Sequence, residues 1–177
     1  TSTGATSYSY SYLVTQDAAM ELEATSTVGG SVQTKTFTLV TTPSVQTAAI
    51  PSWMRQGINY DPANPNKVGL AIYAPGKNYV HVIGSFNNWT VSNAYLMKRD
   101  TSNPNLYWIE ITGLTPQNIY TFQYRTDDGK KVADPYSRLV LSPDDDPWIQ
   151  AADYPSLPVY PTGQQYDVSV VQTGMPT

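Results

Sequence analysis

Hydrophobic and polar residues alternate with a period of two along most of the chain, which is the pattern of half-buried β-strands. Residues 119–126 are the clearest case, because Tyr120, Phe122 and Tyr124 share one face of a strand and polar side chains share the other. Prolines and other turn residues separate the predicted strands, which fall near 68–74, 79–84, 94–98, 106–112, 119–126, 130–133 and 138–141. Short strands at such regular spacing predict an all-β, antiparallel sandwich.

The first 42 residues predict a separate group of three strands. Residues 7–12 alternate serine and tyrosine strictly, a second strand is marked at 20–24, and a third covers 32–40 after the turn signal Gly29-Gly30. Three strands alone bury too little surface for a sandwich. Residues 1–42 are therefore predicted to be part of an immunoglobulin-like domain, or to complete their core against the main domain or a second copy of the chain. An exposed strand edge would favour such self-association.

Proline-rich segments mark the predicted domain boundaries. Residues 43–57 begin at Pro43, contain Pro51 and several small residues, and are predicted to be a linker. The sandwich domain is assigned to residues 58–150. Residues 151–177 are again rich in proline and are predicted to be a second linker.

Composition narrows the classes of function. Only 14% of the residues are charged and the formal net charge is −4, so a nucleic-acid partner, which requires a basic face, is not expected. The chain has no cysteine, which leaves neither a disulfide framework nor a thiol nucleophile. No apolar run approaches the ~18 residues of a membrane span, so none is expected.

The segment 84–89, Gly-Ser-Phe-Asn-Asn-Trp, directly follows a predicted strand. The two asparagines predict a turn, because asparagine tolerates positive φ and hydrogen-bonds its own backbone. Phe86 is expected to enter the core. Trp89 lies past the turn, where an indole could cover the C–H face of a pyranose while Asn88 pairs with its hydroxyl groups. The alternative is that Trp89 is ordinary packing in a sandwich.

Four motifs occur in the order found in a known family, at 68–75, 80–89, 106–114 and 120–136. Together, residues 66–149 resemble the family 48 carbohydrate-binding modules. These modules bind starch or glycogen and precede the catalytic barrel in α-amylase-family glycoside hydrolases such as isoamylases and branching enzymes. The resemblance implies an immunoglobulin-like antiparallel β-sandwich, preceded here by the three strands of a second β-sandwich-like segment.

The tail extends the resemblance. Residues 146–149, 154–161 and 168–174 resemble the linker that leads into the catalytic barrel of secreted Bacteroidetes-type α-amylases. This implies that the chain is the non-catalytic N-terminal module of a larger glycoside hydrolase, without its barrel. The implied partners are an α-glucan (starch, glycogen or maltooligosaccharide) and the catalytic barrel of the parent chain. The implied location is extracellular, cell-surface or periplasmic.

The resemblance also implies a binding site, with two changes. Family members usually pair the signature tryptophan, here Trp89, with a second tryptophan after the late Asp-Gly turn and a lysine in the strand before it. The second position holds Lys130-Lys131, and the lysine position is Gln123. One stacking ring with altered partners is expected to bind weakly, so a structural or weakly binding module is favoured over a competent starch binder. The candidate carbohydrate-binding residues are Trp89, Asn88, Gln123, Lys130, Lys131 and Trp148.

Other aromatic side chains could rebuild a sugar platform, namely Trp148, Tyr136, Trp108, Tyr107 and Trp53. Trp148 follows an acidic turn, and its simpler interpretation is that it docks the linker onto the sandwich. Trp108 is expected to be exposed or to pack under residues 90–98. Trp53 is expected to pack at the start of the central domain.

No catalytic residue is predicted in this chain. Glycoside hydrolysis requires two carboxylates held apart across the scissile bond, whereas the aspartates at 144–146 are adjacent in a turn. The single histidine, His81, alternates with core valines, and without cysteine it indicates neither a zinc site nor a triad. No metal ion or other cofactor is expected. A remaining alternative is an immunoglobulin-like adhesion or interaction module unrelated to sugar, with the tyrosines of 7–12 as its contact ridge.

Overall fold

The computed structural model describes residues 19–28, 31–40 and 42–175, with side chains from residue 42 onward. The chain divides into two units, residues 1–41 and 42–177. In the first unit, β1 (Ala19–Val28) and β2 (Ser31–Val40) pair antiparallel over their whole length. The strands predicted at 20–24 and 32–40 are thus present, whereas the strand predicted at 7–12 lies outside the described residues.

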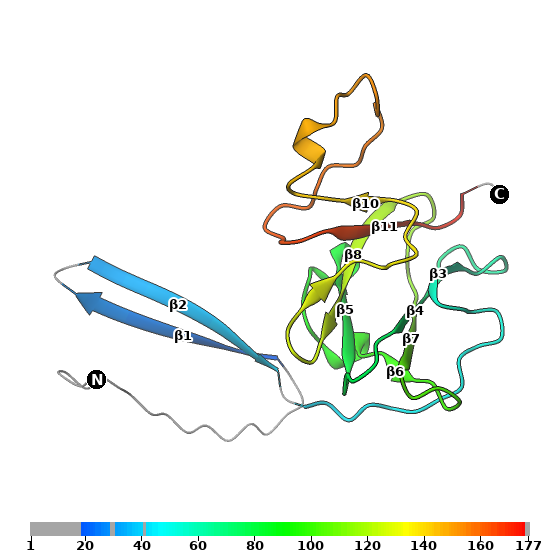
Figure 1. The fold of residues 1–177 in the computed structure, drawn as a ribbon, viewed down its shortest axis with the longest axis horizontal. Coiled ribbons are helices and arrows are strands. Elements are labelled where there is room, and N and C mark those ends of the chain that lie inside the picture. Colours follow the sequence, from blue (N-terminus) through cyan, green and yellow to red (C-terminus); the bar gives the residue numbers. More distant parts are fainter. Residues whose placement is uncertain (1–18, 29–30, 41, 176–177) are drawn as a thin grey trace. The chain divides into compact units, whose positions relative to one another are not determined.

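The second unit contains two antiparallel sheets (Figure 1). One has the order β3-β4-β7-β6, and the other has the order β10-β11-β8-β5, with β9 also paired to β8. The bounds of these strands are β3 (Gly57–Tyr60), β4 (Val68–Tyr73), β5 (Val80–Gly84), β6 (Lys98–Arg99), β7 (Leu106–Ile111), β8 (Ile119–Thr126), β9 (Lys131–Val132), β10 (Val140–Leu141) and β11 (Val168–Gln172). The predicted all-β, immunoglobulin-like sandwich is confirmed.

Three short 3₁₀ helices occur between the strands: η1 (Ser85–Asn87), η2 (Asn93–Tyr95) and η3 (Asp146–Trp148). The residues described by the structure include no α-helix. A search of the same residues found no helix with the length and apolar character needed to cross a membrane.

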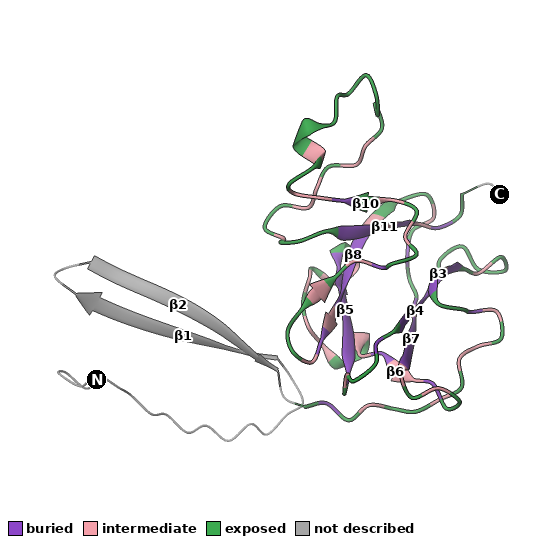
Figure 2. Ribbon diagram, viewed as in Figure 1, coloured by how far each residue is buried: buried purple, intermediate pink, exposed green. Residues whose placement is uncertain are grey.

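The core lies between the facing sides of the two sheets (Figure 2). On β5 and β8 it takes every second residue, including Val80, Val82, Phe122 and Tyr124, all of which are fully buried. The residues between them on β5 and β8 therefore point to the outer side of this sheet. That outer side carries His81, Ile83, Gln123 and Arg125, and it bears on the functional site.

The predicted linker at 43–57 is part of the sandwich instead. The indole of Trp108 donates a hydrogen bond to the carbonyl of Ala48 at 3.0 Å, and the amide of Ile50 donates to Asp100 Oδ1 at 2.9 Å. Met54 is buried against Trp108 in a second apolar cluster, and Trp53 packs at its margin as expected. Trp108 is thus buried under this segment, and Lys98, from the predicted 90–98 region, also lies over its ring, with Nζ 4.7 Å from the ring centroid.

The predicted linker at 151–177 is also wrong in part. Residues 168–172 form β11, which lies between β8 and β10 and pairs with both. Val168 and Val171 are fully buried. Only the preceding stretch, residues 142–167, leaves the sheet, as an excursion that carries η3 (Figure 1). The sandwich is therefore closed by a strand that lies C-terminal to the predicted domain boundary.

Candidate functional site

The turn that carries Trp89 is built around one asparagine. Asn87 Oδ1 accepts a hydrogen bond from the Gly84 amide at 2.8 Å, and its Nδ2 donates to the carbonyls of Val82 and Thr90 at 3.1 and 3.2 Å. The Trp89 amide donates to the Gly84 carbonyl at 2.9 Å. These bonds tie the turn to the end of β5, so that its shape is set before any ligand arrives.

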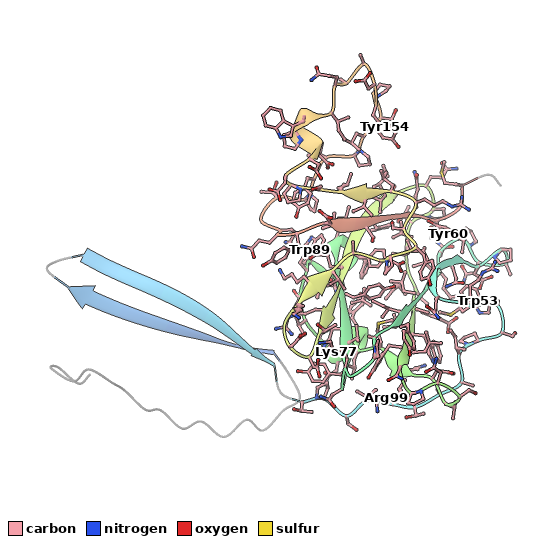
Figure 3. The ribbon with its side chains drawn as sticks, in the orientation of Figure 1. Trp53, Tyr60, Lys77, Trp89, Arg99 and Tyr154 are labelled. Carbon is pink, nitrogen blue, oxygen red and sulfur yellow. The ribbon has the colours of Figure 1, made fainter. Side chains whose placement is uncertain are left out.

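The turn presents its tip in an uncommon backbone conformation. Asn88 has a φ of 52° and Trp89 a φ of 57°, both in the left-handed region. Asparagine accepts this region, but a bulky residue there is strained by about 1 kcal/mol or more. Asn88 is exposed and Trp89, labelled in Figure 3, is half-buried, so part of the Trp89 residue remains accessible. Retained strain of this kind is typical of functional positions.

Phe86 holds the base of the turn against the core. Its ring stacks on Tyr95 with centroids 5.6 Å apart and contacts Tyr120 at 6.4 Å. The side chain is partly buried against the main apolar cluster, as the sequence predicts. Phe86 thus anchors the turn to the core, whereas Trp89 remains at the surface of the turn.

Gln123, a candidate sugar contact, is not available at the surface. It is fully buried on the outer side of β8, and its amide nitrogen donates to the carbonyls of Gln165 at 2.7 Å and Asp167 at 2.9 Å. Residues 165–167 therefore cover the position where the family usually has a lysine. Gln123 is a structural residue that fastens the end of the excursion to the sheet.

Lys130 and Lys131 stand after the late turn, but their surroundings differ. Lys130 is exposed and lies 3.4 Å from Asp128. Lys131 is half-buried, and burial together with the nearby Arg125 lowers the pKa of its ammonium. Neither offers a ring for stacking, so these side chains could contact a sugar only through hydrogen bonds.

Trp148 is the most accessible tryptophan of the described region. It is 81% exposed in η3, so the expectation that it docks a linker onto the sandwich is wrong. The same excursion exposes further apolar side chains, including Tyr154, Val159 and Tyr166. Trp148 and Trp89 make no ring contact with each other among the described aromatic pairs. The structure therefore does not join them into one platform.

Two further residues shape this region beyond the candidates that the sequence predicts. The sequence predicts Asn87 only as part of a turn, although its side chain makes three of the hydrogen bonds that hold the turn. Arg125 lies directly opposite His81 on β5 and opposite Lys131 on β9. The sequence signal for Arg125 is its place on the polar face of 119–126, but the strand register was needed to show its neighbours.

His81 is expected to make stability depend on pH. Burial, and secondarily the charge of Arg125, lowers the pKa of the imidazole from 6.5 to about 4, against a hydrogen bond with Asn93. The unfolded chain thus binds a proton at a higher pH than the folded chain. The stabilisation is complete above pH 6.5 and is lost as the pH falls towards 4, at about 1 kcal/mol per pH unit.

Urea unfolding at pH 7, 6 and 5 measures this slope. The variant His81→Gln should flatten it, because glutamine cannot take up a proton. An unchanged slope in the variant would assign the pH dependence to another group.

Residues 55–137 match the family model described as carbohydrate-binding module 48 (isoamylase N-terminal domain). The 1,4-alpha-glucan branching enzyme GlgB of Butyrivibrio fibrisolvens is 39% identical over 70 residues, which cover 38% of this chain and 11% of the relative. The GlgB of Fusobacterium nucleatum is 31% identical over 87 residues, covering 47% and 14%. The chain thus spans only 11% to 14% of the length of these curated relatives.

Solved structures with some likeness include a putative alpha amylase from Salmonella typhimurium, with a TM-score of 0.37, 22% identity, and coverage of 47% of this chain and 12% of that one. A pullulanase from Paenibacillus barengoltzii, in complex with maltohexaose and alpha-cyclodextrin, gives a TM-score of 0.36 at 19% identity, with the same coverage. The family match covers the part of the sandwich from β3 to β9 and includes the turn of Trp89. Residues 55–137 therefore form a domain that matches the carbohydrate-binding module 48 (isoamylase N-terminal) family.

Proposed function

We propose that this chain is a non-catalytic, weak α-glucan-binding module of an α-amylase-family protein, and that the contact is made by Trp89 and Asn88. The observation that carries the proposal is the pre-shaped turn, in which Asn87 fixes the backbone and the half-buried Trp89 is held at φ 57°. The family match and the α-glucan branching enzymes among the relatives supply the class of ligand.

The chemistry of the turn fits a glucan chain. A flat indole covers the apolar C–H face of a pyranose, and an exposed amide such as that of Asn88 can both donate to and accept from sugar hydroxyl groups. The turn loses little conformational freedom on binding because it is already held by hydrogen bonds, which lowers the cost of association. With Gln123 buried and no second ring beside Trp89, one anchor carries most of the affinity, and the binding is weak.

Co-sedimentation with insoluble starch tests this proposal. The chain is expected to bind, soluble maltoheptaose should compete, and Trp89→Ala should weaken binding about tenfold or more, which is the loss of one anchor residue. Trp148→Ala is the matched control, since it removes an indole outside the proposed contact.

The thermal midpoint of Trp89→Ala should stay close to that of the parent chain, because the ring is only half-buried. Unchanged binding in Trp89→Ala would overturn the proposal. So would a loss of binding in Trp148→Ala alone.

A second function is favoured by the excursion at 142–167. Its apolar side chains are unusually exposed, with Trp148 at 81% and Val159 at 90%. Such exposed apolar groups mark contact surfaces in soluble proteins. We propose that they contact the catalytic barrel of the same protein, so that the module also supports that domain. In a protein that contains both domains, acrylamide should quench Trp148 less than in this chain, with Trp148→Phe isolating its signal. Equal quenching would contradict this role.

A further inference from the structure

Three basic residues lie in one row across three neighbouring strands, β5, β8 and β9. His81 on β5 lies opposite Arg125 on β8, and Arg125 lies opposite Lys131 on β9. Residues that lie directly opposite each other in an antiparallel pair project from the same face. The row therefore spans two strand spacings, about 10 Å, on the outer side of the sheet.

The row has no negative partner in the part of the chain that the structure describes. Neither Arg125 nor Lys131 has a carboxylate oxygen within ion-pair distance among residues 42–175. The nearby Asp128 is already held by Lys77 at 2.8 Å and Lys130 at 3.4 Å. Arg125 and Lys131 are like charges directly opposite each other, which destabilises a sheet, so this pair has an energetic cost that no carboxylate among residues 42–175 offsets.

Two nitrogen atoms of the row are buried without a hydrogen-bond partner, Nη1 of Arg125 and Nδ1 of His81. Leaving such groups unpaired lowers the stability of the folded protein, and more so when the group is charged. The lowered pKa values of Lys131 and His81 report the same surplus of positive charge, since Arg125 contributes to both shifts. Burial of the side chains is the larger cause in each case.

An oxyanion would satisfy what the row lacks. A guanidinium presents several N–H donors in a plane and pairs with phosphate through two parallel hydrogen bonds, while an ammonium adds a compact positive charge. A neutral sugar hydroxyl would relieve the hydrogen bonding but not the repulsion between Arg125 and Lys131. The charge of the row thus selects an anion over an uncharged ligand.

We propose that the partly exposed Arg125 and Lys131, beside the buried His81, form a site for the phosphoryl group of a phosphate monoester. The carrier is a phosphorylated α-glucan, and this identification rests on the proposed function. His81 is three residues before Gly84 on β5, about 10 Å along the strand, and the Trp89 turn begins there. The proposed ligand is one oligosaccharide that contacts Trp89 and carries its phosphoryl group at the row.

Calorimetric titration at pH 7 tests the site with four ligands: phosphorylated maltoheptaose, the same sugar after phosphatase treatment, glucose 6-phosphate and inorganic phosphate. The phosphorylated oligosaccharide is expected to bind at least tenfold more tightly than its dephosphorylated form. Added salt should reduce this difference, because screening weakens charge pairing. Arg125→Gln and Lys131→Gln should each abolish most of it.

Lys98→Gln is the matched control, because it removes the same charge from β6 in the other sheet, where Lys98 lies over the ring of Trp108. It should leave the tenfold preference unchanged. His81 is the chain's single histidine, so its C2–H signal in NMR is unambiguous and should titrate at a higher pH when phosphate is bound. This readout does not depend on affinity.

Each outcome decides between the two proposals. Equal binding of the phosphorylated and dephosphorylated sugars would overturn the anion site and leave the glucan contact at Trp89 intact. Tight binding of glucose 6-phosphate or inorganic phosphate, with no gain from the glucan chain, would overturn the assignment of a glucan carrier. A preference that survives Arg125→Gln would overturn the role of the row.

Discussion

Replacing Asp134 by alanine is expected to lower the free energy of unfolding by about 3 kcal/mol. Asp134 is buried in the loop between β9 and β10, where Oδ2 accepts from the hydroxyl of Tyr124 at 2.7 Å and Oδ1 accepts from the amide of Tyr136 at 2.7 Å. The alanine variant leaves both donors without a partner, and the Tyr124 hydroxyl lies in the core. Each buried unpaired donor costs about 1–3 kcal/mol.

The same aspartate links the loop to β11, because its amide donates to Ser169 Oγ at 2.6 Å. Burial raises the pKa of Asp134, and burial also raises the pKa of Tyr124 well above 10. The pair is therefore a buried hydrogen bond whose loss from either side leaves the other group unsatisfied.

Urea denaturation measures the effect, with Asp153→Ala as the control because Asp153 is exposed on the excursion. The double variant with Tyr124→Phe should cost much less than the sum of the two single variants, since both remove the same bond. A cost below about 1 kcal/mol for Asp134→Ala would contradict the described network.

Gly84→Ala is expected to destabilise the sandwich by about 3 kcal/mol and to weaken starch binding with it. Gly84 has a φ of −172°, an extended conformation that any residue adopts, so its backbone does not require glycine. The reason is space: an added Cβ would lie 2.5 Å from the carbonyl oxygen of Thr121 and 2.9 Å from Phe86 Cε1. Overpacking against backbone costs about 1–3 kcal/mol or more.

The position couples stability to the site because Gly84 is the last residue of β5 and both its amide and its carbonyl hold the Trp89 turn. Gly76→Ala is the control. Nothing lies within 4 Å of its added Cβ, but its φ is 72°, so only a backbone cost of about 1 kcal/mol is expected. Equal destabilisation of the two variants in urea would show that close packing is not what selects glycine at position 84.

The strands could be predicted because the alternation of apolar and polar residues that identifies each strand lies within a few consecutive positions. The alternation over 119–126 gives β8 with its buried face correct, including Phe122 and Tyr124. The turn at 84–89 and the packing of Phe86 follow in the same way, since asparagines and a lone aromatic act within a few residues. The sequence predicts a linker at 168–172 because proline-rich flanks outweigh a short apolar alternation, whereas these residues form β11 and pair with β8, about 50 residues earlier.

The site was harder to predict because its residues depend on distant contacts. The sequence predicts Gln123 to be a solvent-exposed polar residue of a half-buried strand. It is buried in the structure because its side chain donates hydrogen bonds to the carbonyls of Gln165 and Asp167. The sequence around Trp148 predicts a residue that docks onto the sandwich. In the structure Trp148 lies in the excursion at 142–167 and is exposed, because the chain leaves the sheet after β10 and returns to it only at β11. Local sequence specifies strand faces, whereas the pairing of strands decides which of those faces are covered.

The most direct test of the central claim is a titration of the ¹⁵N-labelled chain with maltoheptaose, followed at the indole N–H signals of its four tryptophans. We predict that the Trp89 signal moves in a saturable manner, accompanied by the side-chain amide of Asn88, while the buried Trp108 signal stays in place. Trp89→Phe assigns the peak. No movement of the Trp89 signal at a ligand concentration that saturates starch binding would contradict the account.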